Sequence, residues 1–128
     1  MKEFLWVNPL IVGLIHKLVI KEHGGLYGIR DEGGLESALA RPVNLYAYGL
    51  PTPFELAAAY AYGIAKNHPF LDGNKRTALM ATYTFLESNG FPFVLSEAQA
   101  VVLMRELAAD EISEKEFSEF LEKGVQLG

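Results

Sequence analysis

Helix-capping signals are the feature that most constrains the fold of this chain. Thr52, Ser96 and Ser113 are each followed three residues later by Glu or Gln, which is the spacing of a capping box at the start of a helix. We therefore expect a helix to begin directly after each of them. The first of these helices is alanine-rich, and its composition favours a helix as far as about Lys66.

Two more helices are predicted ahead of these. Asn8 is a suitable N-cap for a helix with Pro9 in its first turn, and the glycine pair at 24–25 is the expected stop. The glycine-dense stretch 25–34 that follows is predicted to be a loop. A short helix over residues 35–42 comes next, and the proline at its end is expected to forbid continuation.

A further helix from about Asn74, stopped by Gly90, brings the expected number to six. Residues 91–95, "FPFVL", are extended but too short and isolated to build a sheet. We therefore predict that residues 1–128 form a single all-α domain, a compact bundle of about six helices. Its centre is expected where two helices approach closely through small residues, namely Ala57, Ala58, Ala59, Ala61, Ala65, Ala78 and Ala81.

Composition and charge exclude several classes of protein. The chain has no cysteine, so it has neither disulfides nor a thiolate metal site, which fits a reducing cytoplasm. A net charge of −5 argues against a general nucleic-acid binder. The longest apolar run, "LAAAYAYGIA", is shorter than the ~20 residues that span a bilayer. Lys2 is balanced by Glu3, and no small-residue cleavage site follows, so no signal peptide is expected.

Most of the polar chemistry gathers in residues 67–81, "NHPFLDGNKRTALMA". If a helix begins near Asn74, its first N–H groups lack intrahelical partners and carry partial positive charge. Gly73 lets the backbone approach a ligand closely. Lys75 and Arg76 in the first turn have the wrong sign for the helix dipole, which makes sense if a strongly anionic group, such as a polyphosphate, binds at that end.

Two other side chains sharpen this interpretation. Asp72 would repel a phosphate unless a divalent cation lies between them, and Mg²⁺ is commonly held by one or two carboxylates together with substrate phosphates. His68 carries an imidazole that accepts a proton near neutral pH. Together these residues match the parts of a phosphoryl or nucleotidyl transferase.

Each residue alone also has a simpler explanation. Asp72, Gly73 and Asn74 make an ordinary turn into an N-cap, and cations such as Lys75 are usually solvated. His16 and His23 are expected to face solvent or to cap the end of the first helix. Phe70 and Leu71 are expected to anchor the loop. Only the conjunction of residues favours a functional site.

The chain resembles the Fic/Doc superfamily, and more closely its death-on-curing (Doc) branch. The superfamily motif H-x-F-x-[DE]-[AG]-N-[GK]-R stands here as residues 68–76, "HPFLDGNKR", and the resemblance extends to "HGGLYGIRDEGGLESALARP" upstream and "TALMATYTFLESNG" downstream. It implies that ATP and Mg²⁺ are bound. It also implies that His68 serves the acceptor hydroxyl, that Asp72 holds the metal and that Asn74, Lys75 and Arg76 grip phosphates.

The resemblance further implies a function. Fic proteins mostly transfer AMP from ATP, whereas Doc-like toxins have lysine at the position of Lys75 and are associated with phosphorylating elongation factor Tu, which halts translation. Fic enzymes usually have a second arginine at the position of Leu79. Both departures favour a cytoplasmic kinase toxin. The rival interpretations are an AMP transferase on the same site and a catalytically idle module that binds nucleotide and a partner.

Regulation is also implied by the resemblance. Self-restrained Fic proteins carry an inhibitory [ST]-x-x-x-E-[GN] helix, and the nearest match, residues 118–123, fails at its last position. An inhibitor in trans is therefore expected, namely an antitoxin whose C-terminal segment folds on the toxin. The segment 23–34, with Arg30 and Asp31, either lines the groove for a target or antitoxin segment or is a glycine-rich connection. In the second case Arg30 and Asp31 pair with each other or cap the next helix.

Overall fold

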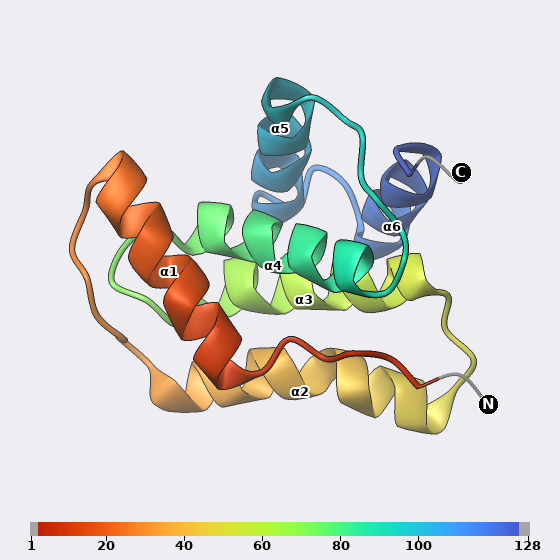
Figure 1. Ribbon diagram of the computed structural model, residues 1–128, viewed down its shortest axis with the longest axis horizontal. Helices are drawn as coiled ribbons and strands as arrows, with labels where there is room; N and C mark the ends of the chain where they lie inside the picture. Colours follow the sequence, from red (N-terminus) through yellow and green to blue (C-terminus); the bar gives the residue numbers. More distant parts are fainter. Residues whose placement is uncertain (1–2, 126–128) are drawn as a thin grey trace.

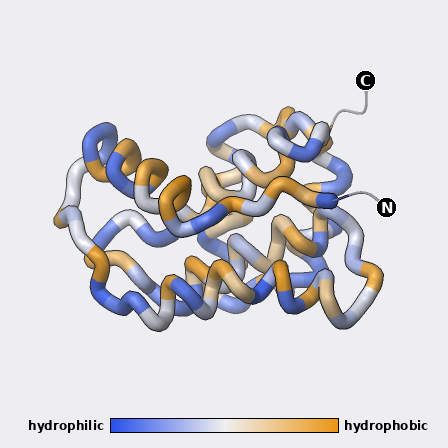
Figure 2. Tube along the Cα trace, turned by 60° about the horizontal axis from the view of Figure 1, so that its bottom comes forward, coloured by the Kyte–Doolittle hydropathy of each residue, from blue (hydrophilic) through white to orange (hydrophobic). Residues whose placement is uncertain are grey.

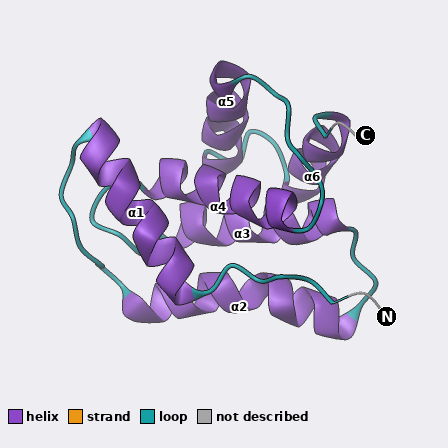
Figure 3. Cartoon of the chain, in the orientation of Figure 1, coloured by secondary structure: helices purple, strands orange, loops and turns teal. Residues whose placement is uncertain are grey.

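A computed structural model describes residues 3–125. These residues form six helices and no strand (Figure 3). The helices are α1 (Pro9–His23), α2 (Glu32–Tyr48), α3 (Pro53–Asn67), α4 (Asn74–Ser88), α5 (Glu97–Ala108) and α6 (Glu114–Lys123). The all-α prediction is thus confirmed. No helix within the described residues is long and apolar enough to cross a membrane.

The predicted helix starts are confirmed by their caps. The side chains of Thr52, Ser96 and Ser113 each accept the predicted hydrogen bond from the backbone three residues later, and in each box the reciprocal side-chain bond is present. Asn8 caps α1 by accepting from the Ile11 N–H. These signals are local, because cap and partner lie within one turn.

The second helix is the exception, because the prediction of a short helix over residues 35–42 is wrong. Asp31 is its N-cap and accepts from the Gly34 N–H at 2.9 Å, so the helix begins three residues early. It also continues through Pro42 to Tyr48. A proline inside a helix removes one backbone hydrogen bond, but Pro42 is buried with the apolar face of α2. Packing therefore overrides the local stop signal.

The two alanine-rich helices lie at the centre of the molecule. α3 and α4 lie side by side (Figure 1). α2 packs along α3 and α1 crosses α4, while α5 and α6 lie on the side of the α3–α4 pair that faces away from α2. All seven alanines named above are at most 1% exposed. Hydrophobic and hydrophilic residues alternate along the helices (Figure 2), as expected for helices with one buried face.

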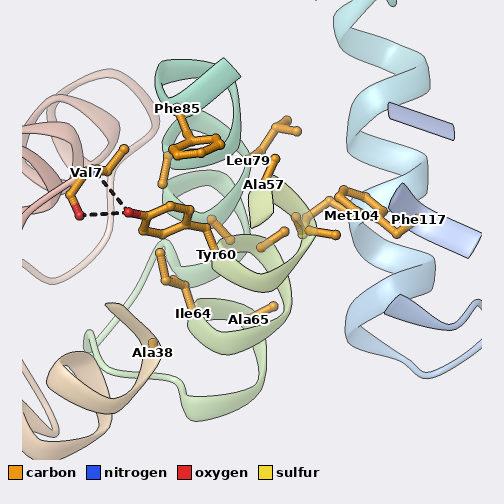
Figure 4. Packing of buried hydrophobic residues seen from close by; sticks show 14 of the residues in the cluster. Val7, Ala38, Ala57, Tyr60, Ile64, Ala65, Leu79, Phe85, Met104 and Phe117 are labelled. Carbon is orange, nitrogen blue, oxygen red and sulfur yellow. Dashed lines mark hydrogen bonds between the residues drawn. The ribbon is translucent and has the colours of Figure 1, made fainter. Parts of the chain in front are cut away.

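Buried polar contacts fix the extended N-terminal segment to this core. The Val7 N–H donates to the Tyr60 hydroxyl at 2.9 Å, in the middle of the hydrophobic cluster (Figure 4). Burial raises the pKa of Tyr60 to about 12, against a smaller lowering by the hydrogen bond to Val7. The Asn89 side chain bonds both the N–H and the carbonyl of Leu5, at 2.8 and 3.0 Å. The start of α1 is thereby placed against the core.

The segment 91–95 is extended, as predicted, and no sheet forms from it. Phe93 makes an isolated antiparallel bridge with Val125, and the Val94 N–H donates to the Gly124 carbonyl at 2.8 Å.

Candidate functional site

The polar loop at residues 68–73 connects α3 to α4 and lies beside the segment 24–31, which connects α1 to α2 (Figure 1). An isolated antiparallel bridge between Ile29 and Phe70 joins the two segments. Two connections that are distant in sequence therefore form one surface.

His68 is the C-cap of α3 and lies in the left-handed region, with φ 46° and ψ 56°. Its carbonyl accepts from Arg30 Nε at 2.8 Å, and the Asn67 carbonyl accepts from Arg30 Nη2 at 3.0 Å. A cation at the C-terminus of a helix is favourable for the helix dipole. Because only its carbonyl is bound among the described residues, His68 keeps an exposed imidazole that is free to meet a substrate.

The structure thus shows what Arg30 and Asp31 do. Asp31 caps the next helix, as one of the two alternatives expected, but Arg30 neither pairs with Asp31 nor caps that helix. It caps α3 and holds the backbone of His68 instead.

We expect Arg30→Ala to destabilise the protein, because two carbonyl groups at the end of α3 lose their donors. These hydrogen bonds are exposed, so the free energy of unfolding should fall by about 1 kcal/mol. Urea denaturation checks the value, and Arg30→Lys, which keeps the charge but not the forked geometry, should restore only part of it. An unchanged urea midpoint for Arg30→Ala would contradict the capping role.

Asp72 is exposed and is held from two sides. Its carboxylate Oδ2 accepts from the Leu26 N–H at 2.7 Å, and its carbonyl lies 2.8 Å from Nε2 of His16. The other carboxylate oxygen, Oδ1, has no hydrogen-bond partner within residues 3–125. One oxygen is therefore used for positioning, and the other is available to a ligand.

The N-terminus of α4 is open. Gly73 is its N-cap residue, with φ 78°, and no side chain in the described part of the chain caps it. A Cβ on Gly73 would lie 3.2 Å from Val19 and 3.3 Å from Ile20, both on α1, so the site requires glycine for its conformation and is tight for any side chain. The first N–H groups of α4 have no carbonyl partner within the helix, which leaves a backbone nest for an anion.

Asn74 has a different role from its neighbours. It is buried, and its side chain closes the loop by accepting from the Phe70 N–H at 2.9 Å and donating to the Phe70 carbonyl at 3.0 Å. Its side chain therefore shapes the loop, and its backbone N–H, in the first turn of α4, is the group that remains for a ligand. Phe70 is a buried anchor, as expected, whereas Leu71 is 47% exposed and is fixed through its N–H, which donates to Gly28.

Three cations lie together near this nest. Lys75 and Arg76 line a small hollow of about 220 Å³ with Arg105 of α5, and the buried side chain of Leu79 lies at its wall. Arg76 also approaches Glu97, with Nη1 and Oε1 3.4 Å apart, an exposed ion pair of small energetic value. Arg105 carries no signal in the sequence, because only the packing of α5 on α4 brings it here.

The prediction that His16 faces solvent or caps the first helix is wrong. His16 is 1% exposed, and its ring lies parallel to that of Phe70, with centroids 3.9 Å apart. The apolar face of α1 is turned toward the loop, so a histidine on this face becomes part of the wall behind it. His23, by contrast, is exposed near the end of α1, as expected.

A metal site built from many protein ligands is absent from the described part of the chain, where no three His, Cys, Asp or Glu residues gather. Asp72, which has one oxygen without a partner among residues 3–125, could instead supply a single carboxylate ligand. Such a ligand suits Mg²⁺ that is also bound by substrate phosphates and water.

A family comparison agrees with this geometry. The model of the Fic/DOC family matches residues 6–86, which include the loop, the segment 24–31 and the helices around them. The chain belongs to the Fic/DOC family.

Two characterised relatives place the chain in the Doc branch of this family. It is 46% identical over 70 residues to the protein named Toxin Doc of Mycolicibacterium smegmatis, covering 52% of this chain and 53% of the relative. It is 38% identical over 85 residues to the Protein kinase doc of Escherichia phage P1, covering 66% of this chain and 68% of the relative. The match thus spans about half the length of the first Doc relative and about two thirds of the second.

Proposed function

We propose that this Fic/DOC protein is the toxin of a type II toxin–antitoxin pair and an ATP-dependent protein kinase. It transfers the γ-phosphate of ATP to a hydroxyl of a translation factor similar to elongation factor Tu, in the cytoplasm, and so arrests translation. The observation that carries the proposal is the intact motif at residues 68–76. Its His68 and Asp72 are exposed on the loop that leads directly into a helix N-terminus with no side-chain cap. The names of the two Doc relatives support it.

The groups of the site divide the reaction between them. His68 takes the proton from the acceptor hydroxyl as that oxygen attacks the γ-phosphorus atom of ATP. The bond between this phosphorus and the bridging oxygen to the β-phosphate breaks, and ADP leaves. The backbone nest at Gly73 and Asn74, with the side chains of Lys75 and Arg76, binds the phosphates and absorbs their charge. Little covalent chemistry is required of the protein, because phosphoryl transfer depends mostly on positioning and on electrostatic stabilisation.

Mg²⁺ fits the site through the Asp72 Oδ1 atom, which has no partner among the described residues. A bound Mg²⁺ would neutralise charge on the phosphates. Because Asp72 Oδ2 is already tied to the Leu26 N–H, the carboxylate is oriented before any ligand arrives, and little side-chain entropy remains to be lost.

An antitoxin is the second proposed partner, and the fold offers a place for its C-terminal segment. A groove of about 850 Å³ runs between α1 and α4. Its walls are largely apolar, including Leu18, Met80 and Tyr83, and Arg76 of the phosphate site lines it too. A segment lying in this groove would cover Arg76 and so restrain the site.

Two rival functions use the same geometry. An AMP transferase is disfavoured by Lys75, which adds an exposed cation in the first turn of α4, and by Leu79, which places a buried apolar side chain where a second arginine would be needed. A catalytically idle binding module is disfavoured by the retention of both His68 and Asp72.

One experiment distinguishes these functions. The protein is incubated with a set of purified translation factors, Mg²⁺ and ATP labelled at either the α- or the γ-phosphate. Label from the γ-phosphate on a factor supports the kinase. Label from the α-phosphate selects the AMP transferase, and nucleotide binding without any transfer selects the idle module.

We expect Asp72→Asn to lower the transfer rate at low Mg²⁺ and to recover part of it at higher Mg²⁺. The amide keeps the shape of the side chain but loses the negative charge that attracts the cation. A loss of about 10-fold to 100-fold at limiting metal is the expected range for a ligand or its support. Full activity of the parent protein in the presence of a chelator would contradict the metal role of Asp72.

A further inference from the structure

His16 lies outside the motif, in the middle of α1, yet it contacts the motif at two points. Its Nε2 atom is 2.8 Å from the carbonyl oxygen of Asp72. Its ring lies parallel to that of Phe70, with an interplanar angle of 9° and a centroid distance of 3.9 Å, and the ring of Tyr27 packs against it at 5.5 Å. The side chain is 1% exposed, so it cannot contact a substrate directly.

The hydrogen bond to the Asp72 carbonyl requires a proton on one particular nitrogen of the His16 ring. A backbone carbonyl oxygen can only accept, so Nε2 of His16 must carry the proton and donate it. The Asp72 carbonyl is thereby fixed by a group whose own orientation is fixed by two aromatic rings.

Three contacts together determine where the carboxylate of Asp72 lies. His16 holds its carbonyl, and Leu26 holds Oδ2 from the segment beside the loop. The next residue, Gly73, lies against Val19 and Ile20 so closely that no side chain fits without movement. The backbone that follows the Asp72 side chain is therefore held against α1, and the unpaired Oδ1 is presented from a fixed base.

We propose that His16 is a positioning residue that acts through Asp72, by holding its carbonyl so that Oδ1 is presented to a divalent cation at the phosphates. The inference rests on the proposed function for the metal role of Asp72. The competing explanation is that His16 only fills the core. The two explanations predict different results for a variant that keeps an aromatic ring at residue 16 but has no N–H donor. Metal affinity falls if His16 positions Asp72, and it is unchanged if His16 only fills the core.

Four single variants separate the hydrogen bond from the packing. His16→Phe keeps an aromatic ring against Phe70 but has no donor. His16→Gln places an amide nitrogen near the position of Nε2, whereas His16→Asn is too short to reach the Asp72 carbonyl. His23→Phe makes the same chemical change at an exposed position of the same helix and is the matched control.

The measurement is Mn²⁺ binding, followed by electron paramagnetic resonance, in the presence of the non-hydrolysable analogue AMP-PNP, with AMP-PNP alone as the blank. We expect His16→Phe and His16→Asn to bind Mn²⁺ about fivefold to tenfold more weakly, as the loss of one hydrogen bond implies. His16→Gln should stay within about threefold of the parent, and His23→Phe should be unchanged. Thermal melting by circular dichroism confirms that each variant is folded at the assay temperature.

A double-variant cycle tests whether His16 acts through Asp72. In an Asp72→Asn background, adding His16→Phe should change Mn²⁺ affinity by less than about twofold, because residues that act as one unit are not additive. Equal losses for His16→Gln and His16→Asn, parent affinity in a folded His16→Phe, or additive effects in the cycle would each overturn the proposal.

The outcome for His16 is distinguishable from that for the proposed function. The parent protein is measured in both assays. If it binds Mn²⁺ with AMP-PNP but transfers no γ-phosphate from labelled ATP to any translation factor, the kinase assignment is contradicted, while the comparison of the His16 variants still stands. A parent whose Mn²⁺ affinity is insensitive to Asp72→Asn overturns the metal role of Asp72 and the His16 inference with it.

Discussion

Replacing His68 by alanine is expected to abolish both the growth arrest and the transfer of label. The imidazole of His68 is exposed at the end of α3, while its backbone is held in a left-handed conformation by Arg30. Loss of a general base costs about 10²-fold to 10⁴-fold in rate. The fold should survive, because the side chain is exposed and the hydrogen bonds at this position are made by the carbonyl.

The measurement has two parts. Parent and variant are expressed without a partner protein while growth and protein synthesis are followed, and the purified proteins are compared in the two-label assay. His23→Ala, a change at an exposed histidine of α1, is the control and should remain fully toxic. If the His68→Ala protein is folded and as toxic as the parent, His68 is not the catalytic base.

Replacing Lys75 by glycine is expected to remove most of the γ-phosphate transfer. The ammonium group of Lys75 is exposed beside the open N-terminus of α4 and has no ion-pair partner among the described residues. We expect it to attract the most highly charged end of the nucleotide, so that the terminal phosphate faces the hydroxyl near His68. A glycine leaves the nest open, which suits a nucleotide that presents its α-phosphate.

The fold should tolerate this change, since glycine at an exposed helical position costs about 1 kcal/mol. Lys75→Arg keeps the charge and should retain much more transfer than Lys75→Gly. The two-label assay on all three proteins is the measurement. Leu79 in place of a second arginine disfavours AMP transfer by Lys75→Gly. Label that arrives from the α-phosphate with the parent protein would reject the kinase assignment.

The sequence predicted those parts of the fold that depend on neighbouring residues. Capping boxes such as Thr52 with Glu55 satisfy donors within a single turn, so their pattern can be found without any knowledge of the rest of the chain. The motif at residues 68–76 is similar, because its candidate groups are nearly contiguous. A helix start near Asn74 was enough to indicate that Lys75 and Arg76 lie beside unpaired N–H groups.

Local rules failed where distant packing decided the outcome. Pro42 predicts the end of a helix, yet α2 continues through it. The buried face of α2 packs on α3, where Gly63 allows close approach to Ala38. The free energy of burying that face offsets one missing hydrogen bond. No pattern within α2 contains this information.

The sequence by itself determined five of the six helix starts, all but that of α2, and gathered the candidate groups of the site in one loop. Only the tertiary structure decided which residues hold that loop in place. His16, Leu26 and Arg30 are 38 to 56 positions away from the groups that they bind, and two of the three contacts use backbone carbonyls, which are the same in every residue. A hydrogen bond to a distant backbone group leaves no pattern in the sequence of either partner, so it becomes visible only when the helices have packed.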